Sequence, residues 1–344
     1  MPYPDVDNKN VMMKVVTQSE SECVIIVNIK GKTFNTDKKF TFEHEQKFSI
    51  RGGKDAVLME IPMDGCPLWS EHNPALCEAV VTLRSLQGTD VQKTTFGMRK
   101  FATDGTQFTI NNKPTFLRGK HDACVFPQTG YAPMDVESWL KIFKTAKAYG
   151  INHYRFHSWC PPEAAFEAAD LVGIYLQPEL PFWGCFEKDK FRLNRFLYNE
   201  GIEILDKFGS HPSFVMMALG NELCGDVNIM RQWKEEFHQR DDRHLYAFGS
   251  NNNLGWQGQQ EGEDFLVTCR IGGEEPEKYN THVRASFSFA DAFEGGILNG
   301  TYPNTRMNFD NALKASTVPV VRLASSRYIQ TLQRRPNTQA CWRR

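Results

Sequence analysis

From about residue 104, short apolar runs alternate with amphipathic stretches, and this alternation constrains the fold more than any other feature. Apolar runs occur in INHYRFHSW, IYLQPELPFWG and FVMMALG. In DVESWLKIFKTAKAYG the apolar residues have helical spacing, with Asp135 as a predicted N-cap and Gly150 as the stop. FTINNKPTFLRGK predicts a hairpin and then a strand through Phe116. Alternating strands and helices imply a parallel sheet, and the repeat number points to a (β/α)8 (TIM) barrel.

The N-terminal part has a different pattern. Residues 11–50 alternate apolar and polar in VMMKVVTQ, CVIIVNIK and KFTFEHEQKFSI. Short β-rich runs separated by polar turns predict an antiparallel β-sandwich. We therefore expect a sandwich over residues 1–100 and a barrel over residues 101–321, followed by a tail over residues 322–344 that fits neither pattern.

The stretch MMALGNELCGD (216–226) carries the strongest candidate for chemistry. Its apolar run ends in Gly220-Asn221-Glu222, which places Asn221 and Glu222 at the carboxyl end of a predicted buried strand. Barrel enzymes place their chemistry at that end. Partial desolvation of Glu222 would favour the protonated form that a general acid needs. The alternative is that Glu222 caps the next helix or pairs with a nearby Arg.

Several segments together resemble glycoside hydrolase family 2, the β-galactosidase, β-glucuronidase and β-mannosidase group. HPSF followed by an apolar strand and GNE resembles the family's acid/base segment. PLWSEHNPALCEAVVTL and FGMRKF resemble segments that close its immunoglobulin-like domain and lead into its barrel, and FTINNKPTFLRGK resembles its barrel entry. The resemblance implies an immunoglobulin-like β-sandwich followed by a TIM barrel, with Glu222 as acid/base and Asn221 as ligand of the sugar 2-hydroxyl.

The resemblance also implies further sugar contacts. Arg155 and His157 end the second predicted barrel strand, although the Arg-x-His spacing differs from the commoner family pattern. Glu179 ends the third strand and resembles a sugar-hydroxyl ligand or a residue that orients one, while Trp183 offers a stacking face. A purely structural Arg–Glu pair is the alternative. His121 follows Arg118-Gly119 more closely than the family's usual His does, so we do not assign it to the site.

The second carboxylate of a retaining glycosidase is missing where the family has it. That nucleophile is a Glu after the seventh strand, here expected at 316–321, yet residues 311–344 contain no Asp or Glu. Asp291 and Glu294 are the candidates to replace it, but they lie in a Gly-rich segment that favours a loop. An eighth strand is also missing from the pattern, so the barrel is predicted to be incomplete, and without the nucleophile turnover by this chain is in question.

The tail itself is unusual, because residues 322–344 hold six Arg and no acid. Shifted codons from Leu323, with synonymous choices, can spell GQFQIYPDFAKKTEYTGVLE, which resembles the family's continuation. A frameshift with a small deletion after Val321 is our hypothesis, and a coding sequence without an in-frame homologous segment would contradict it. A nucleic-acid-binding tail is the weaker alternative.

Composition limits the remaining functions. The net charge is −1 and no basic stripe precedes residue 322, so we expect no nucleic-acid partner. The sequence contains no apolar run long enough to span a membrane, and residues 1–10 do not resemble a signal peptide. The nine cysteines are scattered singly, which favours free thiols and no metal site. The family resemblance implies that no cofactor is needed and that the substrate or ligand is a carbohydrate with a terminal β-linked sugar. The two hypotheses are an exo-β-glycosidase and a non-catalytic sugar-binding remnant of one.

Overall fold

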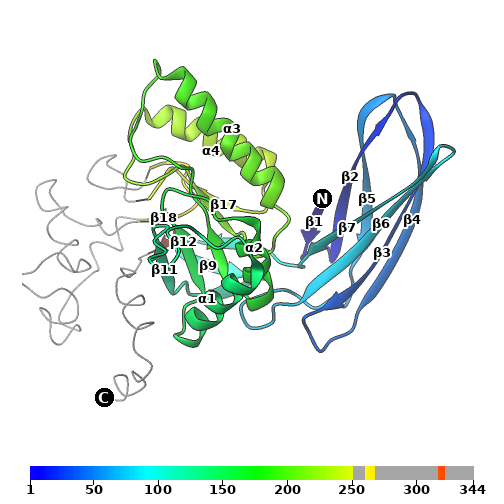
Figure 1. Ribbon diagram of the computed structural model, residues 1–344, viewed down its shortest axis with the longest axis horizontal. Helices are drawn as coiled ribbons and strands as arrows, with labels where there is room; N and C mark the ends of the chain where they lie inside the picture. The colour runs from blue at the N-terminus through cyan, green and yellow to red at the C-terminus, as the bar shows by residue number, and fades with distance from the viewer. Residues whose placement is uncertain (251–259, 268–316, 322–344) are drawn as a thin grey trace, which may run out of the picture.

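The structure is a computed structural model that describes residues 1–250, 260–267 and 317–321. Its described part has two halves that lie next to each other, a β-sandwich and an α/β half (Figure 1). No helix within these ranges is long and apolar enough to cross a membrane. Asp291, Glu294 and the predicted tail over residues 322–344 lie outside the described residues.

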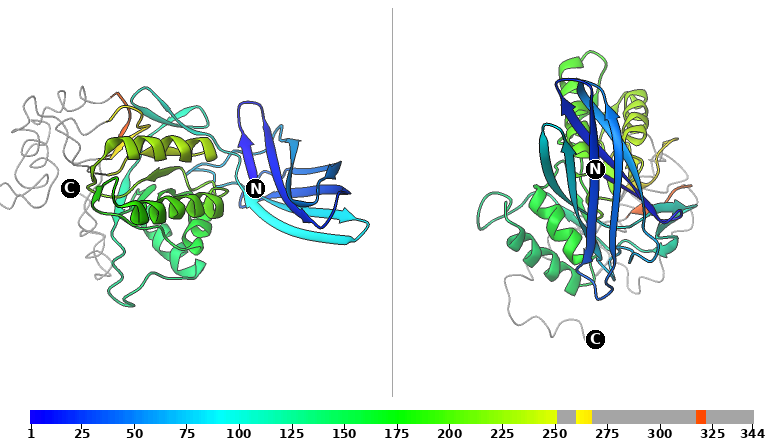
Figure 2. Two further views of the ribbon diagram at one scale, coloured as in Figure 1. Left: turned by 90° about the horizontal axis from the view of Figure 1, so that it is seen from above. Right: turned by 90° about the vertical axis from the view of Figure 1, so that its right-hand side faces the viewer.

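The N-terminal half is a two-sheet antiparallel sandwich, as the alternating pattern predicted. One sheet has the order β1-β2-β5 and the other the order β4-β3-β6-β7. The first sheet consists of β1 (Pro2–Asp5), β2 (Asn10–Ser19) and β5 (Gly53–Pro62). The second consists of β3 (Cys23–Phe34), β4 (Thr41–Ile50), β6 (Leu76–Ser85) and β7 (Gly88–Phe96). The two sheets face each other in Figure 2.

Alternate residues of these strands form the sandwich core. Val11 and Met13 of β2 and Val27 and Ile29 of β3 are fully buried, and Met59 of β5 lies in the same cluster. Burial of every second residue matches the period of a strand whose other face meets solvent. The packing of apolar side chains between the sheets therefore explains why this part of the sequence alternates.

Two segments, one between β5 and β6 and one after β7, fix the sandwich against the α/β half. The Trp69 indole lies in the shared apolar cluster and donates to the Asp170 carbonyl at 2.9 Å. The buried guanidinium of Arg99 donates to the carbonyls of Pro212, Phe214 and Arg243. A Cβ at Gly97 would lie 2.8 Å from Trp69 and 2.9 Å from Pro212, so the close approach of the two halves requires glycine there.

The chain then enters a small meander and a ladder of parallel strands. The meander consists of β8 (Phe101–Asp104), β9 (Gln107–Ile110) and β10 (Lys113–Thr115). The predicted strand through Phe116 is wrong: this side chain is 68% exposed, and the first parallel strand begins at Gly119. The parallel strands are β11 (Gly119–Asp122), β12 (His153–Phe156), β13 (Tyr175–Gln177), β15 (Met216–Ala218), β17 (Leu245–Ala247), β18 (Leu266–Val267) and β19 (Val320–Val321).

Pairings and single bridges join these strands in one order. β11, β12 and β13 form one parallel sheet, β15 pairs with β17, and β18 pairs with β19. Parallel bridges connect Leu176 to Phe214, Glu179 to Ala218, and Ser250 to both Asn221 and Val267. The carboxyl ends of neighbouring strands therefore meet at one edge of the ladder.

Four helices lie in the described part of the α/β half, each between two parallel strands: α1 (Val136–Ala148), α2 (Glu163–Val172), α3 (Phe191–Phe208) and α4 (Val227–Arg240). Asp135 caps α1 by accepting from the Ser138 amide, and Gly150 follows with a φ of 82°, as predicted. Pro162 precedes α2, which ends at the left-handed Gly173. The helices cover the strand ladder from outside (Figure 2) and bury Trp139, Phe166 and Phe237 against it.

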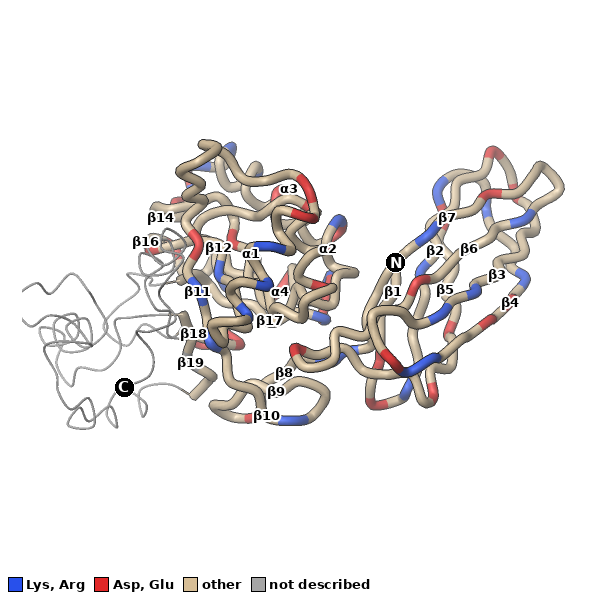
Figure 3. Tube along the Cα trace, turned by 60° about the horizontal axis from the view of Figure 1, so that its bottom comes forward, with Lys and Arg blue, Asp and Glu red and all other residues tan. Residues whose placement is uncertain are grey.

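Charge is mixed over both halves. Along the Cα trace, basic and acidic residues alternate in the sandwich and in the α/β half without a stripe of one sign (Figure 3). Several of them form ion pairs at the surface, among them Arg84 with Glu45 and Arg240 with Asp206.

Candidate active site

The carboxyl ends of three neighbouring parallel strands bring most of the predicted site residues together. Arg155 lies in β12, Glu179 follows β13, and Asn221 and Glu222 follow β15. The bridges from Glu179 to Ala218 and from Asn221 to Ser250 set these strand ends at the same level. Residues separated by more than sixty positions in the sequence therefore meet in one cluster.

Glu179 is the centre of that cluster and is fully buried. Arg155, 2% exposed, donates to it from Nε at 2.6 Å and from Nη2 at 3.1 Å. The Ser158 amide donates to Oε2 at 2.8 Å, and the Ser250 hydroxyl donates to Oε1. A carboxylate has about four acceptor sites, so Glu179 is saturated by protein donors. Of its two predicted roles, orienting its neighbours fits this geometry better than contacting a sugar.

Arg155 transmits this order to Asn221. Its Nη2 donates to the side-chain oxygen of Asn221, which is 2% exposed. With its oxygen held by Arg155, the amide group of Asn221 has a fixed orientation, and its two N–H donors face away from the guanidinium. An amide held in this way can donate hydrogen bonds to the hydroxyl group of a ligand.

Glu222 is held by its backbone in an unusual conformation. Its φ is 51°, in the left-handed region that residues other than glycine rarely adopt, and its amide donates to the Ser250 carbonyl at 2.7 Å. The side chain is half-buried. Asp226, not Glu222, caps the next helix α4 by accepting from the Asn228 amide, so the capping alternative for Glu222 is wrong. Strained backbone of this kind concentrates at functional sites.

Three aromatic rings line the neighbouring surface. His121 and His157 stack with ring centroids 4.8 Å apart, and His157 meets Trp183 edge-on at 4.9 Å. Trp183 is 60% exposed, which leaves an indole face free for stacking. Burial lowers the pKa of His121 to about 3, helped by the charge of Arg155. Burial, followed by Arg155, also lowers the pKa of His157, so both rings are neutral at pH 7.

Sequence reasoning missed three residues of this site. His121 was set aside because of its spacing, yet parallel pairing places it opposite Arg155 in the next strand. No pattern in the sequence distinguishes Ser158 and Ser250 from other serines. The structure brings both next to Glu179, to which the Ser158 amide and the Ser250 hydroxyl donate. The position of His121 could have been predicted, because it lies at the end of the strand before that of Arg155, and the ends of neighbouring parallel strands lie at the same edge of a sheet.

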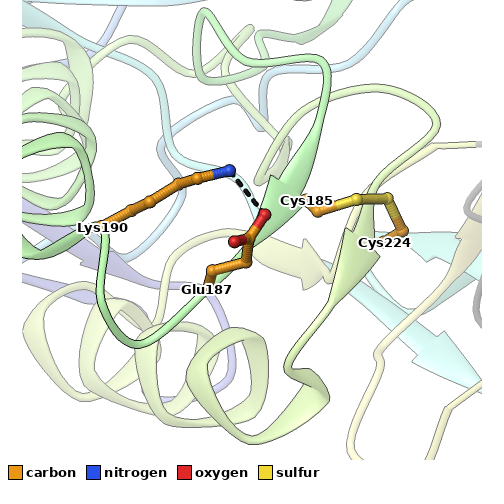
Figure 4. The surroundings of a disulfide bond; sticks show 4 residues. All are labelled: Cys185, Glu187, Lys190 and Cys224. Carbon is orange, nitrogen blue, oxygen red and sulfur yellow. Dashed lines mark hydrogen bonds and ion pairs between the residues drawn. A yellow bond between two sulfur atoms is a disulfide. The ribbon is translucent and has the colours of Figure 1, made fainter.

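One prediction about the cysteines is wrong. Cys185 and Cys224, 39 residues apart, form a disulfide, because two short strands pair in parallel there, β14 (Cys185–Phe186) and β16 (Cys224–Gly225) (Figure 4). Single cysteines in the sequence gave no indication of this contact. The other cysteines of the described residues are free thiols: Cys23, Cys66, Cys77, Cys124 and Cys160.

The described residues contain no group of three or more His, Cys, Asp or Glu side chains arranged to hold a metal ion. The chemistry available at these strand ends is that of a half-buried carboxyl group, a fixed amide, neutral imidazoles and an exposed indole. Such a combination can bind a polar ring with an apolar face and exchange a proton with it.

The sequence is similar to a family model and to curated proteins. Residues 2–99 match the model of the family described as glycosyl hydrolases family 2. A β-galactosidase of Pseudoalteromonas haloplanktis is 24% identical over 252 residues, which are 68% of this chain and 24% of that protein. The chain therefore spans about a quarter of the length of this curated relative.

Solved structures share the fold. A glycosyl hydrolase family 2 member from Bacteroides cellulosilyticus aligns with a TM-score of 0.67 at 16% identity, over 92% of this chain and 43% of that one. The Parabacteroides merdae β-glucuronidase aligns with a TM-score of 0.59 at 20% identity, over 79% and 35% of the two chains. Its family-model match over residues 2–99, its curated relatives and its fold together support the assignment of this chain to glycoside hydrolase family 2.

Proposed function

We propose that this chain binds a terminal β-linked sugar at the strand ends that carry Asn221 and Glu222, and that it belongs to a retaining exo-β-glycosidase. The observation that carries the proposal is the chain of hydrogen bonds from Glu179 through Arg155 to Asn221. The buried Arg155–Glu179 ion pair fixes the side-chain amide of Asn221, and the next residue is the half-buried Glu222. A purely structural ion pair has no need of the adjacent strained Glu222.

In the proposed reaction Glu222 is the acid/base. It protonates the leaving glycosidic oxygen and later deprotonates the attacking water, while a second carboxylate attacks the anomeric carbon. Asn221 donates to the sugar 2-hydroxyl, and its orientation comes from Arg155. Trp183 and His157 form the wall against which the sugar ring stacks. Neither a metal ion nor a cofactor enters this scheme.

We further propose that the α/β half, residues 101–321, is an incomplete (β/α)8 barrel that follows a sandwich domain over residues 1–100. The parallel order of the seven strands β11, β12, β13, β15, β17, β18 and β19 supports this. So do the four helices that separate successive strands. The site then lies at the carboxyl-terminal face of the barrel, where enzymes of this fold have theirs.

A second candidate function is sugar binding without turnover. It is favoured by the absence of acidic residues from position 311 to 344, where the family's nucleophile is expected. Glu179 is a poor substitute, because four donors already occupy its two oxygens. Under this proposal the chain keeps the sugar-binding and acid/base parts of the site and lacks the group that forms the glycosyl-enzyme bond.

Turnover of a panel of aryl β-glycosides distinguishes the two functions. The panel starts with 4-nitrophenyl β-D-galactoside and β-D-glucuronide, and it is run with the wild type, Glu222→Gln and Glu187→Gln. Glu187 is a matched control, since its carboxylate pairs with Lys190 at the surface and both side chains are 45% exposed.

Release of nitrophenol that Glu222→Gln abolishes and Glu187→Gln retains would establish a glycosidase. Release equal in all three proteins would contradict the role of Glu222. No release from folded wild type, together with sugar binding, would establish the second function.

A further inference from the structure

The disulfide joins the two loops that carry the site. Cys185 lies in the loop after β13, two residues beyond Trp183, and Cys224 lies in the loop after β15, two residues beyond Glu222. The strands β14 and β16 pair in parallel at this point (Figure 4). The bond therefore lies next to the acid/base segment rather than in the core of either half.

Three backbone hydrogen bonds attach the Glu222 segment to the same loop. The amide of Asn221 donates to the Phe182 carbonyl at 3.0 Å, and that of Cys224 to the Gly184 carbonyl at 3.1 Å. The amide of Asp226 donates to the Phe186 carbonyl at 2.8 Å. These bonds flank Glu222 on both sides, so its position depends on how closely the two loops approach.

Two glycines show how close that approach is. A Cβ at Gly220 would lie 2.3 Å from the Phe182 carbonyl oxygen, and one at Gly225 would lie 2.1 Å from the Phe186 carbonyl oxygen. Both glycines also have a positive φ, at 137° and 95°. Glu222 lies between them in the left-handed region, a conformation that persists only where its surroundings hold it.

We propose that Cys185 and Cys224 are positioning residues that hold Glu222 in place through their disulfide, so that the geometry of the site depends on the redox state of this pair. The consequence for acid/base chemistry rests on the proposed function, whereas the restraint on the backbone does not. Both cysteines are only partly buried, which leaves the bond within reach of a small reductant.

Reduction by a dithiol such as dithiothreitol follows ordinary thiol–disulfide exchange. A reductant thiolate attacks one sulfur of the pair and forms a mixed disulfide, releasing the other cysteine as a thiolate. The second thiol of the reductant then displaces the first cysteine. The protein gains two electrons and two protons as a pair of thiols, and the reductant becomes a cyclic disulfide.

Hydrogen exchange with oxidised and dithiol-reduced protein tests the restraint without any need for activity. We expect the amides of Asn221, Cys224 and Asp226 to exchange at least about tenfold faster after reduction, with unchanged exchange in α1 and β3. The double variant Cys185→Ser, Cys224→Ser should behave like reduced protein whether or not dithiol is present. Cys23→Ser, a partly buried free thiol in the sandwich, is the control and should behave like the wild type.

A second readout separates positioning from general stabilisation. In protein labelled with carboxyl-13C glutamate, the Glu222 resonance is identified by its absence in Glu222→Gln, and we expect it to shift on reduction while other Glu signals stay. Equal exchange in both redox states and an unmoved Glu222 signal would overturn the proposal. Faster exchange throughout the α/β half would also overturn it, because the bond would then stabilise the fold as a whole. Sugar binding in the oxidised state tests the proposed function separately.

Discussion

Replacing Glu179 by Gln tests whether the buried network organises the site. Glu179 and Arg155 have side chains 0% and 2% exposed, and they share two hydrogen bonds. The variant keeps the size of the side chain but leaves the guanidinium buried without its counterion. The variant also replaces one carboxylate oxygen by an amide N–H₂, which then faces the donor groups of Arg155, Ser158 or Ser250.

The expected magnitude follows from this burial. Breaking a buried ion pair by removing one partner costs about 3–5 kcal/mol, because the remaining charge has lost both solvent and partner. We therefore expect Glu179→Gln to lower the free energy of unfolding of the α/β half by about that amount. With a urea dependence of about 2–3 kcal/mol per M, the unfolding midpoint should fall by roughly 1–2.5 M.

Urea unfolding followed by tryptophan fluorescence is the assay. Trp139, Trp159 and Trp233 all pack in or against the core of the α/β half, so this signal reports on the half that carries the network. Glu163→Gln is a matched control in the same half, since it removes the partner of Lys207 at 3.5 Å with side chains 52% and 59% exposed. Such a surface pair contributes at most about 1 kcal/mol. A midpoint shift for Glu179→Gln no larger than that of the control would refute the reasoning.

Three further predictions concern other parts of the structure. Arg99→Met should lower the free energy of unfolding by about 1–3 kcal/mol in urea titrations, because it removes the guanidinium that donates to the carbonyls of Pro212, Phe214 and Arg243, and an unchanged midpoint would contradict this. Burial lowers the pKa of His211, but the charge and hydrogen bond of Asp170 outweigh it and raise the pKa above 6.5. The stability from this pair should be complete below about pH 6.5 and disappear as pH rises through the raised value, a decline that His211→Asn should lack. Burial raises the pKa of Glu263 from 4.5 to about 8, so its contribution should be lost between those pH values, and thermal unfolding of Glu263→Gln should not show that loss.

The sequence predicted helices and strands well where the cause is local, that is, where a residue acts on the backbone next to it or a periodic pattern marks the buried face. Asp135 and Gly150 bound the first helix because a capping carboxylate and a left-handed glycine act on adjacent backbone. The apolar run before Asn221 and Glu222 predicted a buried strand, because a strand covered on both faces needs apolar residues throughout. Alternation in β2 and β3 predicted the sandwich, because one face of each sheet is buried.

The contacts that complete the site depend on strand order, which local patterns do not contain. Ser250 reaches Glu179 only because the strand end after β17 follows that after β15 in the ladder. Cys185 and Cys224 meet through a two-residue strand pairing too short to have a periodicity. His121 joins His157 because β11 pairs with β12 in register, while its spacing in the sequence pointed away from the site.

Sugar binding measured by saturation-transfer difference NMR tests the central claim most directly, because it does not depend on turnover. The probes are methyl β-D-galactoside and methyl β-D-glucuronide, with the wild type, Asn221→Ala, Trp183→Ala and the surface control Glu187→Gln. We predict ring-proton signals from at least one probe in the wild type and in the control, lost in Asn221→Ala and weakened in Trp183→Ala. Signals equal in all four proteins, or none from the folded wild type with either sugar, would contradict a sugar site at the ends of these strands.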